Sequence, residues 1–374
     1  MADQRMDELQ IEGLTSILSA RVRLGAMNVL VGANGAGKSN FIQALGLLGR
    51  LADSQLERYA VFHGGASSMI NAGNGGLARI NIHVVSGLNH YGARLTAAAN
   101  DSLVFDQEEV YRPSPEDPFR TVLGDGHRET KLGEARKGPT AQVAEHIIAL
   151  LRECRVYHFD DTSRDAPVKR QVPTADNIAL REDAENLAAV LFRLKNSKRG
   201  LDKAAYRRIR GAVRLVAPFL QDFLLEDELG TDTIRLRWIH RDFDRVFSAE
   251  QMSDGTLRFI CLATLLFQPE LPGLVVLDEP ELGLHPFAIS ILSDMLKQAS
   301  KRSQVIIATQ SVTLMNQFTV DDLIVVETGE SGSVFRRRTE EQLRSWLADY
   351  SLGELWEKNI LGGQPGSAGS FLDD

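Results

Sequence analysis

Residues 27–39 read Met-Asn-Val-Leu-Val-Gly-Ala-Asn-Gly-Ala-Gly-Lys-Ser, and this stretch decides the fold class. Its first five residues form an apolar run that is typical of a strand buried inside a parallel sheet. A glycine-rich turn follows, and a helix is predicted to begin near Lys38, because apolar residues then recur at helical spacing. These residues are Phe41, Ile42, Leu45, Leu48 and Leu51. A strand, a glycine turn and a helix in this order indicate an α/β domain.

Residues 32–39 fit the pattern G-x-x-x-x-G-K-[ST] between a predicted strand and a predicted helix. The glycines let backbone N–H groups converge on phosphate oxygens, and the helix N-terminus adds a partial positive charge. Lys38 is suited to neutralise the β- and γ-phosphates, and Ser39 can offer its hydroxyl to Mg²⁺. We therefore predict that a nucleoside triphosphate is held by Gly32, Asn34, Gly35, Ala36, Gly37, Lys38, Ser39 and Asn40.

A second candidate site follows the apolar run 274–277, which leads directly into Asp278-Glu279-Pro280-Glu281. Acids at the end of a buried strand lie at the carboxyl edge of a sheet. Asp278 is suited to hold Mg²⁺ through water, and Glu279 to orient and deprotonate an attacking water. Taken alone, an apolar run followed by Asp-Glu is an ordinary strand end as often as it is a catalytic site. Together with the glycine-rich loop it predicts nucleotide hydrolysis.

A third motif, Ser253-Asp254-Gly255-Thr256, precedes an apolar helix predicted over residues 257–267. A serine and a glycine at a helix N-terminus can contact a second phosphate. The same residues also make a plain helix N-cap. Local chemistry leaves both interpretations open.

Composition excludes several other classes of protein. No apolar stretch reaches the roughly 18 to 20 residues of a membrane-spanning helix, and no signal peptide is recognisable. Cys154 and Cys261 lie in no metal-binding or disulfide pattern, and His158 and His285 lack a second metal ligand at suitable spacing. The sequence contains no G-x-S-x-G elbow, so it does not indicate a serine hydrolase. We expect a soluble, cytoplasmic protein with no membrane partner.

The charge of the chain is unevenly distributed. The whole molecule has a formal net charge of −8, so its average field does not attract nucleic acid. Residues 193–214 nevertheless carry nine basic residues against one acid, Asp202: Arg193, Lys195, Lys198, Arg199, Lys203, Arg207, Arg208, Arg210 and Arg214. This stretch is either a surface for DNA or RNA, or a solvated face, or a dock for an acidic protein.

The pattern of elements predicts four segments. Residues 1–139 hold the glycine-rich loop and an antiparallel β subdomain, with strands over 78–85 and 91–98 and a loop over 112–139. Residues 140–232 form a mainly helical lobe, with helices over 140–153, 183–194 and 204–223. Residues 233–346 return to strands and helices, and we expect the first and last thirds of the chain to share one sheet. Residues 347–374 form a C-terminal segment whose Gly- and Ser-rich end, 362–370, is predicted to be disordered.

Taken together, residues 32–40, 253–258 and 278–286 resemble the ABC-type ATPase heads of the RecF/SMC/OLD-like group. More narrowly, the chain is similar to stand-alone bacterial AAA-family ATPases of the AAA_21 class. Further stretches resemble that class, so that the likeness covers nearly the whole chain: 157–163, 185–187 and 352–356. The resemblance implies an α/β P-loop NTPase of ABC-head type, with an antiparallel β subdomain, an inserted mainly helical lobe, and ATP and Mg²⁺ as cofactors.

The resemblance also implies a homodimer that encloses two ATP molecules face to face. Ser253 and Gly255 would contact the γ-phosphate held by the Lys38 of the second copy, and residues 280–285 would line the interface. ATP hydrolysis would then be coupled to a nucleic-acid-related process, DNA repair or antiviral defence. Because the chain ends too soon after Gln310 for a nuclease domain, we expect the effector to be a separate protein.

One residue departs from the pattern of these heads. Where a histidine usually follows the next strand, this chain has Gln310, which can hydrogen-bond the γ-phosphate but carries no charge. The substitution favours slow hydrolysis and an alternative function, an ATP-gated clamp that sequesters or releases a partner protein. A transporter subunit would share the motifs, but the long helical insertion and the Ser-Asp-Gly-Thr sequence argue against it. Gln107 and Gln142 both remain candidates for the glutamine that such heads carry near the nucleotide.

Overall fold

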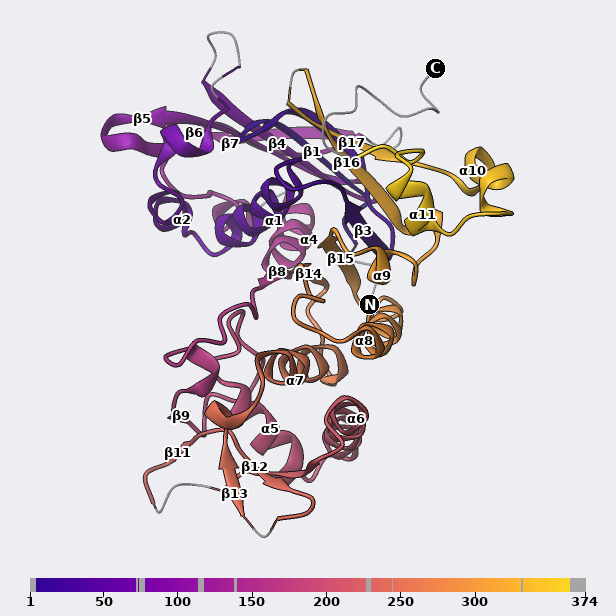
Figure 1. Ribbon diagram of the computed structural model, residues 1–374. Coiled ribbons are helices and arrows are strands. Elements are labelled where there is room, and N and C mark those ends of the chain that lie inside the picture. Colours follow the sequence, from indigo (N-terminus) through magenta and orange to yellow (C-terminus); the bar gives the residue numbers. More distant parts are fainter. Residues whose placement is uncertain are drawn as a thin grey trace. The chain divides into compact units, whose positions relative to one another are not determined.

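The computed structural model describes residues 5–71, 73, 78–113, 118–137, 140–226, 230–243, 245–330 and 332–363. The chain forms two compact units (Figure 1). Unit 1 comprises Met1–Arg155, Pro272–Val276 and Ile306–Asp374, and unit 2 comprises Val156–Leu271 and Leu277–Val305. The fourfold division expected from the sequence stays a prediction. The tail that the sequence predicts to be disordered, residues 362–370, lies almost wholly outside the described residues.

Unit 1 contains an antiparallel sheet in the order β2-β1-β4-β5-β6-β7. The strands are β1 (Glu8–Leu14), β2 (Ile17–Arg23), β4 (Arg79–Ser86), β5 (Asn89–Ala98), β6 (Ser102–Arg112) and β7 (Phe119–Gly124). Along β4 every second residue is buried, so one face of the sheet is covered and the other meets solvent. The predicted β subdomain and its strands near 78–85 and 91–98 are confirmed.

Strand β7 corrects the loop predicted over residues 112–139. It pairs antiparallel with β6, with Tyr111 opposite Arg120 and Val110 opposite Thr121. All its residues are exposed or only partly buried. An edge strand without a buried face shows no alternating apolar pattern, and this is why the sequence conceals it.

The second sheet of unit 1 has the order β17-β16-β3-β15-β14-β8. Its strands are β3 (Met27–Val31), β8 (Cys154–Tyr157), β14 (Leu274–Asp278), β15 (Gln304–Thr309), β16 (Leu323–Gly329) and β17 (Gly332–Arg337), of which β8, β14 and β15 have end residues assigned to unit 2. All residues of β3 and β15 are buried. Because β3 pairs in parallel with β16, the first and last thirds of the chain share one sheet, as predicted.

The helices α1 (Lys38–Ala52), α2 (Leu56–Phe62) and α4 (Ala141–Arg152) lie on one side of the antiparallel sheet (Figure 1). All five apolar residues predicted to form the inner face of α1 are buried. Unit 1 is completed by α3 (Ala66–Met69), α9 (Val312–Met315), α10 (Glu340–Leu347) and α11 (Leu352–Glu357).

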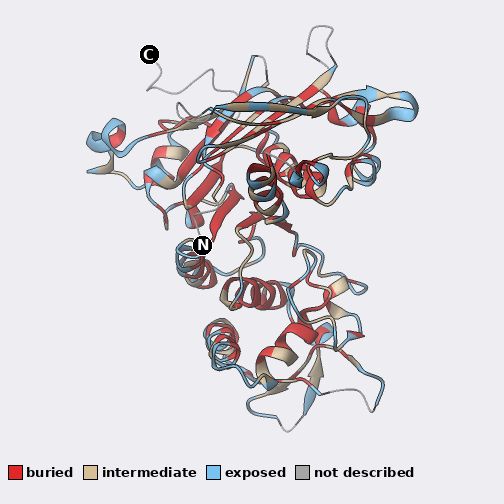
Figure 2. Cartoon of the chain, turned by 180° about the vertical axis from the view of Figure 1, so that it is seen from behind, coloured by how far each residue is buried: buried red, intermediate tan, exposed pale blue. Residues whose placement is uncertain are grey.

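Unit 2 is built around α7 (Asp254–Phe267), whose residues 256–266 are all buried (Figure 2). Helices α5 (Leu187–Asn196), α6 (Gly200–Val216) and α8 (Pro286–Ala299) pack against it. Five short strands form a three-stranded sheet, β10-β12-β13, and a two-stranded sheet, β11-β9. They are β9 (Val172–Pro173), β10 (Leu220–Leu224), β11 (Thr233–Ile234), β12 (Arg237–His240) and β13 (Val246–Ser248).

Two predicted helices of unit 2 have different bounds. The helix expected over 204–223 is α6, which ends at Val216 and is followed by strand β10. Pro218 explains this end, because proline disfavours the helical conformation of the residue before it. The helix expected over 183–194 begins only at Leu187, since Ala184 has a φ of 58° and lies in a turn. No helix in the described part of the chain is long and apolar enough to span a membrane.

Candidate nucleotide-binding and signature regions

Residues 32–39, here called the phosphate loop, connect β3 to α1 in unit 1. Gly35 and Gly37 have φ angles of 78° and 113°, which side chains other than glycine rarely adopt. Gly37 is the N-cap of α1, so the loop leads directly into the N-terminus of a fifteen-residue helix. The backbone conformation is therefore that of a loop whose N–H groups can face an anion.

Two glycines of the phosphate loop are required by close packing. A Cβ on Gly32 would overlap the carbonyl oxygen of Val326 in β16. A Cβ on Gly37 would overlap the hydroxyl of Ser333 in β17. The loop thus takes its shape from neighbouring strands as well as from its own glycines.

The ammonium group of Lys38 lies over the start of the phosphate loop. Its side chain is buried, with 6% of the residue exposed. Nζ donates hydrogen bonds to the carbonyls of Gly32, at 2.8 Å, and Ala33, at 3.0 Å. A positive charge is thereby held beside the helix N-terminus.

Ser16 and Ser333, which the sequence analysis did not single out, contact each other and residues of the phosphate loop and α1. Their hydroxyls lie 2.6 Å apart, and the Ser16 hydroxyl also accepts a hydrogen bond from Asn40 Nδ2 at 2.6 Å. The backbone N–H of Ser333 donates to the Ser16 carbonyl. Asn40 therefore has a structural partner, and its contact with a nucleotide stays a prediction.

A second support comes from the C-terminal part of unit 1. The Ala33 N–H donates to the Gly363 carbonyl at 2.8 Å, and the Gly363 N–H donates to Glu327 Oε1 at 2.9 Å. Arg336 pairs with the other oxygen of the same carboxylate at 3.0 Å. The first of these contacts joins residues 330 positions apart, so no local pattern in the sequence could reveal it.

Most of the remaining predicted residues of unit 1 are exposed. Asn34, Gly35 and Ser39 are exposed on the phosphate loop, and Ala36 is buried. Gln310 is exposed directly after β15, the strand next to β3 in the sheet order. Unit 1 thus holds the loop, Lys38, Ser39 and Gln310.

The acidic turn, residues 278–285, belongs to unit 2. Glu279 has a φ of 44°, an uncommon left-handed conformation for a residue with a side chain. Two hydrogen bonds close the turn, from Leu282 N to Glu279 O at 3.1 Å and from Leu284 N to Glu281 O at 2.9 Å. The backbone at Glu279 is therefore fixed by the turn that follows it.

The signature segment, residues 253–258, begins α7 in unit 2. Ser253 is the N-cap, and its Oγ accepts a hydrogen bond from Thr256 N at 3.3 Å and lies 2.8 Å from Thr256 Oγ1. The plain capping interpretation is thus realised. Ser253 also remains exposed, so the cap leaves the residue accessible to a ligand.

Arg258 is the functional candidate that sequence analysis missed in this unit. The residue is only 8% exposed, and its guanidinium donates to three carbonyls. Nε donates to Phe159 at 2.9 Å, Nη2 to Asp160 at 3.0 Å, and Nη1 to Leu282. The arginine therefore joins the signature segment to the acidic turn and to residues 159–160.

The same contact region explains Gly255. A Cβ on this residue would overlap the carbonyl oxygen of Gly283. The signature segment and the acidic turn thus touch through their backbones. Three of the stretches that carry the family resemblance, near residues 159, 255 and 282, meet within unit 2.

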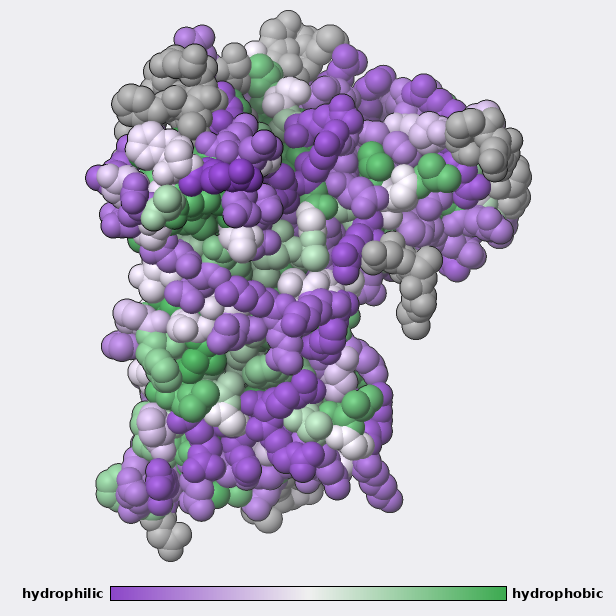
Figure 3. Space-filling model, turned by 90° about the vertical axis from the view of Figure 1, so that its right-hand side faces the viewer, coloured by the Kyte–Doolittle hydropathy of each residue, from purple (hydrophilic) through white to green (hydrophobic). Residues whose placement is uncertain are grey.

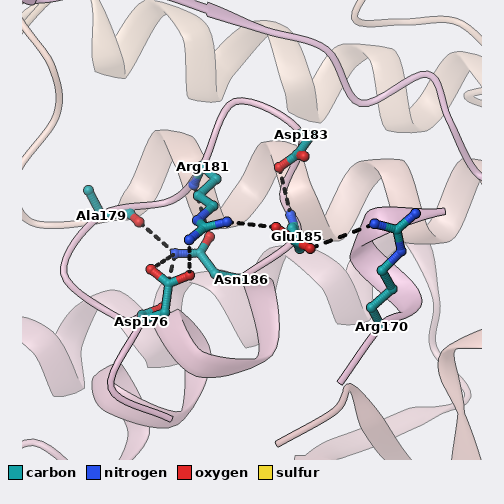
Figure 4. Close-up of polar contacts among 7 residues, drawn as sticks. All are labelled: Arg170, Asp176, Ala179, Arg181, Asp183, Glu185 and Asn186. Carbon is teal, nitrogen blue, oxygen red and sulfur yellow. Dashed lines mark hydrogen bonds and ion pairs between the residues drawn. The ribbon is translucent and has the colours of Figure 1, made fainter. Parts of the chain in front are cut away.

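Asn186, part of another such stretch, has a structural role (Figure 4). It is fully buried, and its Nδ2 donates to the carbonyls of Asp176, at 3.0 Å, and Ala179, at 2.8 Å. Its Oδ1 accepts from Arg181 N at 2.9 Å. Arg181 pairs in turn with Glu185 at 2.6 Å and with Asp176 at 2.9 Å. Asn186 thereby fixes the turn that precedes α5.

Neither cysteine is suited to nucleophilic chemistry. Both are buried, and burial raises the pKa of each thiol, Cys154 and Cys261, to about 12. The described residues contain no group of three or more His, Cys, Asp or Glu side chains that could hold a metal ion by themselves.

Comparison with known proteins identifies the fold. The AAA_21 family model, described as “AAA domain, putative AbiEii toxin, Type IV TA system”, matches residues 27–316. An SMC head solved with the C-winged helix domain of ScpA is 17% identical, with a TM-score of 0.54 over 91% of this chain and 99% of that chain. An SMC head with an extended coiled coil, bound to the C-terminal domain of ScpA and derived from Pyrococcus furiosus, is 16% identical, with a TM-score of 0.54 over 92% and 98%. No curated protein matches the sequence. The expected fold, that of an ABC-type P-loop NTPase head with an antiparallel sheet subdomain, is confirmed.

Proposed function

The chain belongs to the AAA_21 family, and from this premise we propose that it binds and hydrolyses ATP with Mg²⁺ as an ATP-enclosing homodimer. The observation that carries the proposal is the phosphate loop of unit 1. Its positive-φ glycines, its helix N-terminus and the buried Lys38 ammonium form a preorganised anion site. A Cβ at Gly32 or Gly37 would overlap neighbouring atoms and disturb this cradle.

The site residues have defined roles in this proposal. Lys38 binds the β- and γ-phosphates, and Ser39 and Asp278 hold Mg²⁺, since hydroxyl and carboxylate oxygens are the donors that this cation prefers. When bound, Mg²⁺ neutralises charge on the phosphate oxygens. Asn34, Gly35 and the N–H groups of the loop hold the triphosphate.

Hydrolysis requires a group that orients and deprotonates water, and Glu279 fills this role in the proposal. The turn formed by residues 279–284 fixes its backbone. Gln310 can donate a hydrogen bond to the γ-phosphate but cannot supply a positive charge. We therefore expect slow turnover.

The homodimer is supported by the surface of unit 2. Leu282 and Phe287 are large apolar residues that are each 55% exposed, on either side of His285, which caps α8. Exposed apolar side chains next to a candidate ligand site are typical of an interface. Ser253 and Gly255 would contact the γ-phosphate bound by the second copy.

The proposal for the biological process starts from the family description. The family description refers to a toxin of a type IV toxin–antitoxin system, and this supports antiviral defence. We propose that the ATP cycle acts on a nucleic-acid-related process, defence or DNA repair, through a separate effector protein. The second candidate function, a slowly hydrolysing clamp that sequesters or releases a protein, is favoured by Gln310.

Light scattering combined with phosphate release tests the proposal. With ATP and Mg²⁺, the mass of the Glu279→Gln variant should double from the protomer mass of 41.3 kDa. The mass of the Lys38→Ala variant should not change. Glu341→Gln, at an exposed position on α10, is the matched control and should behave like the wild type. A Glu279→Gln variant that binds ATP but stays monomeric contradicts the homodimer. Phosphate release that is equal in the wild type and in Glu279→Gln contradicts the role of Glu279 and favours the clamp.

A further inference from the structure

Helix α6 packs one face against the rest of unit 2 and exposes the other to solvent. Its buried face consists of residues spaced three or four apart, namely Asp202, Ala205, Tyr206, Ile209, Ala212 and Val213. The helix lies at the right-hand edge of unit 2 in Figure 1, the side that faces the viewer in Figure 3. In Figure 3 the lower part of the molecule is mostly hydrophilic, with smaller hydrophobic areas between.

Four of the nine basic residues in 193–214 have carboxylate partners. The pairs are Arg193–Asp202 at 3.6 Å, Lys195–Asp222 at 3.2 Å, Arg199–Glu270 at 3.1 Å and Arg210–Asp222 at 3.6 Å. All these contacts lie within unit 2, so this part of the charge run contributes to its structure. These four residues therefore have partners inside the unit and are set apart from the rest of the basic stretch.

Three further cations form a straight row on the exposed side of α6. Lys203, Arg207 and Arg214 are exposed, and no carboxylate of the described residues pairs with them. At about 100° and 1.5 Å per residue, they lie within about 40° of one another around the helix and span about 16 Å along it. The only acid of α6, Asp202, is buried on the opposite side.

Two further arginines lie near the C-terminal end of α7. The Arg208 guanidinium, from α6, stacks over Phe267, 5.8 Å from the ring centroid. Arg302 donates to the carbonyls of Leu266, at 3.0 Å, and Gln268, at 3.3 Å, at the end of α7. Burial and then the nearby positive charge of Arg208 lower the pKa of Arg302. Like charges are thus held near each other by their carbonyl and aromatic partners.

Gly211 interrupts the exposed side of α6 between Arg207 and Arg214. A glycine inside a helix is less favourable than an alanine. Nothing lies within 4 Å of where its Cβ would be, so no packing inside the chain requires a glycine. The missing side chain leaves the helix backbone open to close approach from outside.

We propose that Lys203, Arg207, Arg208, Gly211 and Arg214, here called the basic face, bind the phosphate backbone of double-stranded nucleic acid without reading its bases. Regularly spaced cations along a rod complement a phosphate backbone, and guanidinium groups fit phosphate oxygens with two donors. None of the exposed residues of α6 is aromatic, so the helix offers no ring on which unpaired bases could stack, and this favours duplex over single strand. The inference names the partner for the nucleic-acid-related process proposed above and in that sense rests on it.

Fluorescence anisotropy with a labelled 30-base-pair duplex of random sequence, between 50 and 200 mM NaCl, tests the basic face. The variant Lys203→Glu/Arg207→Glu/Arg214→Glu should bind at least about tenfold more weakly, and the slope of log affinity against log salt should fall by about 3. The control Arg58→Glu/Lys137→Glu/Arg344→Glu makes the same change of net charge at exposed positions of unit 1 and should keep the slope. Gly211→Leu leaves every charge in place and should still weaken binding several-fold, although it favours the helix.

Several outcomes would overturn the inference. They are a triple variant that binds like the wild type, a Gly211→Leu variant with unchanged affinity, and a single strand of equal length that binds as tightly as the duplex. Binding of poly-glutamate without binding of duplex would assign the basic face to an acidic protein instead. Failure of the ATPase proposal is distinguishable, because the triple variant should keep its basal phosphate release and Lys38→Ala should keep its duplex binding in the absence of ATP.

Discussion

In unit 1, the phosphate loop takes its shape from missing side chains: the Val326 carbonyl and the Ser333 hydroxyl occupy the space where Cβ atoms of Gly32 and Gly37 would lie. In unit 2, the signature segment is held by one large side chain, because Arg258 alone reaches carbonyls on two other stretches of chain. The first region is fixed by close packing of backbone and small groups. The second is fixed by hydrogen bonds from a buried charge.

The phosphate loop and the signature segment should be sensitive to different substitutions. A close-packed loop tolerates the loss of one hydrogen bond but not an added methyl group, because neighbouring atoms have no room to move. A segment held by one buried guanidinium does not tolerate the loss of that group, since several carbonyls then lose their donors together. Each consequence can be measured separately, because the chain has three tryptophans: Trp238 in unit 2, and Trp346 and Trp356 in unit 1.

The largest effect is expected for Arg258→Met. The substitution keeps much of the side-chain volume but removes the donors to Phe159, Asp160 and Leu282, and we expect a loss of about 3 to 5 kcal/mol in the free energy of unfolding of unit 2. Denaturant unfolding followed by Trp238 fluorescence, in a Trp346→Phe/Trp356→Phe background, measures it. Arg207→Met, at an exposed position, is the control and should cost less than about 0.5 kcal/mol. Equal losses in the two variants would show that Arg258 does not hold the segment.

The next effect is expected for Gly37→Ala in unit 1. The new Cβ meets the Ser333 hydroxyl at a φ of 113°, so both overlap and backbone strain contribute, together about 2 to 3 kcal/mol. Gly35→Ala separates the two causes, because Gly35 also has a positive φ, 78°, but nothing within 4 Å of its Cβ position, and should cost only about 1 kcal/mol. Unfolding followed by Trp346 and Trp356, with Trp238 replaced by Phe, compares them. If the two alanine variants are equally stable, packing against Ser333 does not shape the loop.

This contrast also explains which parts of the molecule the sequence could predict. The strand, the phosphate loop and α1 follow one another directly, so periodicity and glycine spacing were sufficient to predict them. The partners of the loop, Ser16 and Ser333, are ordinary serines more than 300 positions apart, and only the paired strands bring them together.

Unit 2 was harder to predict for a related reason. The three carbonyls bound by Arg258 are backbone groups, which every residue has, so the sequence does not show which of them Arg258 binds. The early end of α6, by contrast, was readable from Pro218, and the prediction missed it because the apolar spacing continues into β10. In unit 1, the exposed edge strand β7 was missed because it has no buried face and therefore no alternating apolar pattern.

A smaller effect is expected for Asn186→Ala, which tests whether unit 2 depends on other side-chain hydrogen bonds in the same way as on Arg258. The substitution removes the partners of the Asp176 and Ala179 carbonyls and of the Arg181 N–H, and we expect a loss of about 1 to 2 kcal/mol. Asn196→Ala is the matched control, since that residue is exposed and bonds only within its own helix. Trp238 fluorescence reports both variants. A cost for Asn196→Ala as large as that for Asn186→Ala would remove the distinction.

The smallest effect, and the one with a pH signature, concerns Asp222 beside α6. Burial raises the pKa of this carboxyl, but hydrogen bonds from Tyr206, at 2.6 Å, and Lys195, at 3.2 Å, outweigh burial and leave the pKa below its usual value. A carboxyl whose pKa is lower in the folded state stabilises the fold above its unfolded pKa of about 4, and this stabilisation is lost as the pH falls through the folded pKa. Asp222→Asn should therefore cost about 1 kcal/mol at pH 7 and progressively less towards pH 2. A cost that is independent of pH would show that the charge of Asp222 does not contribute to the stability of unit 2.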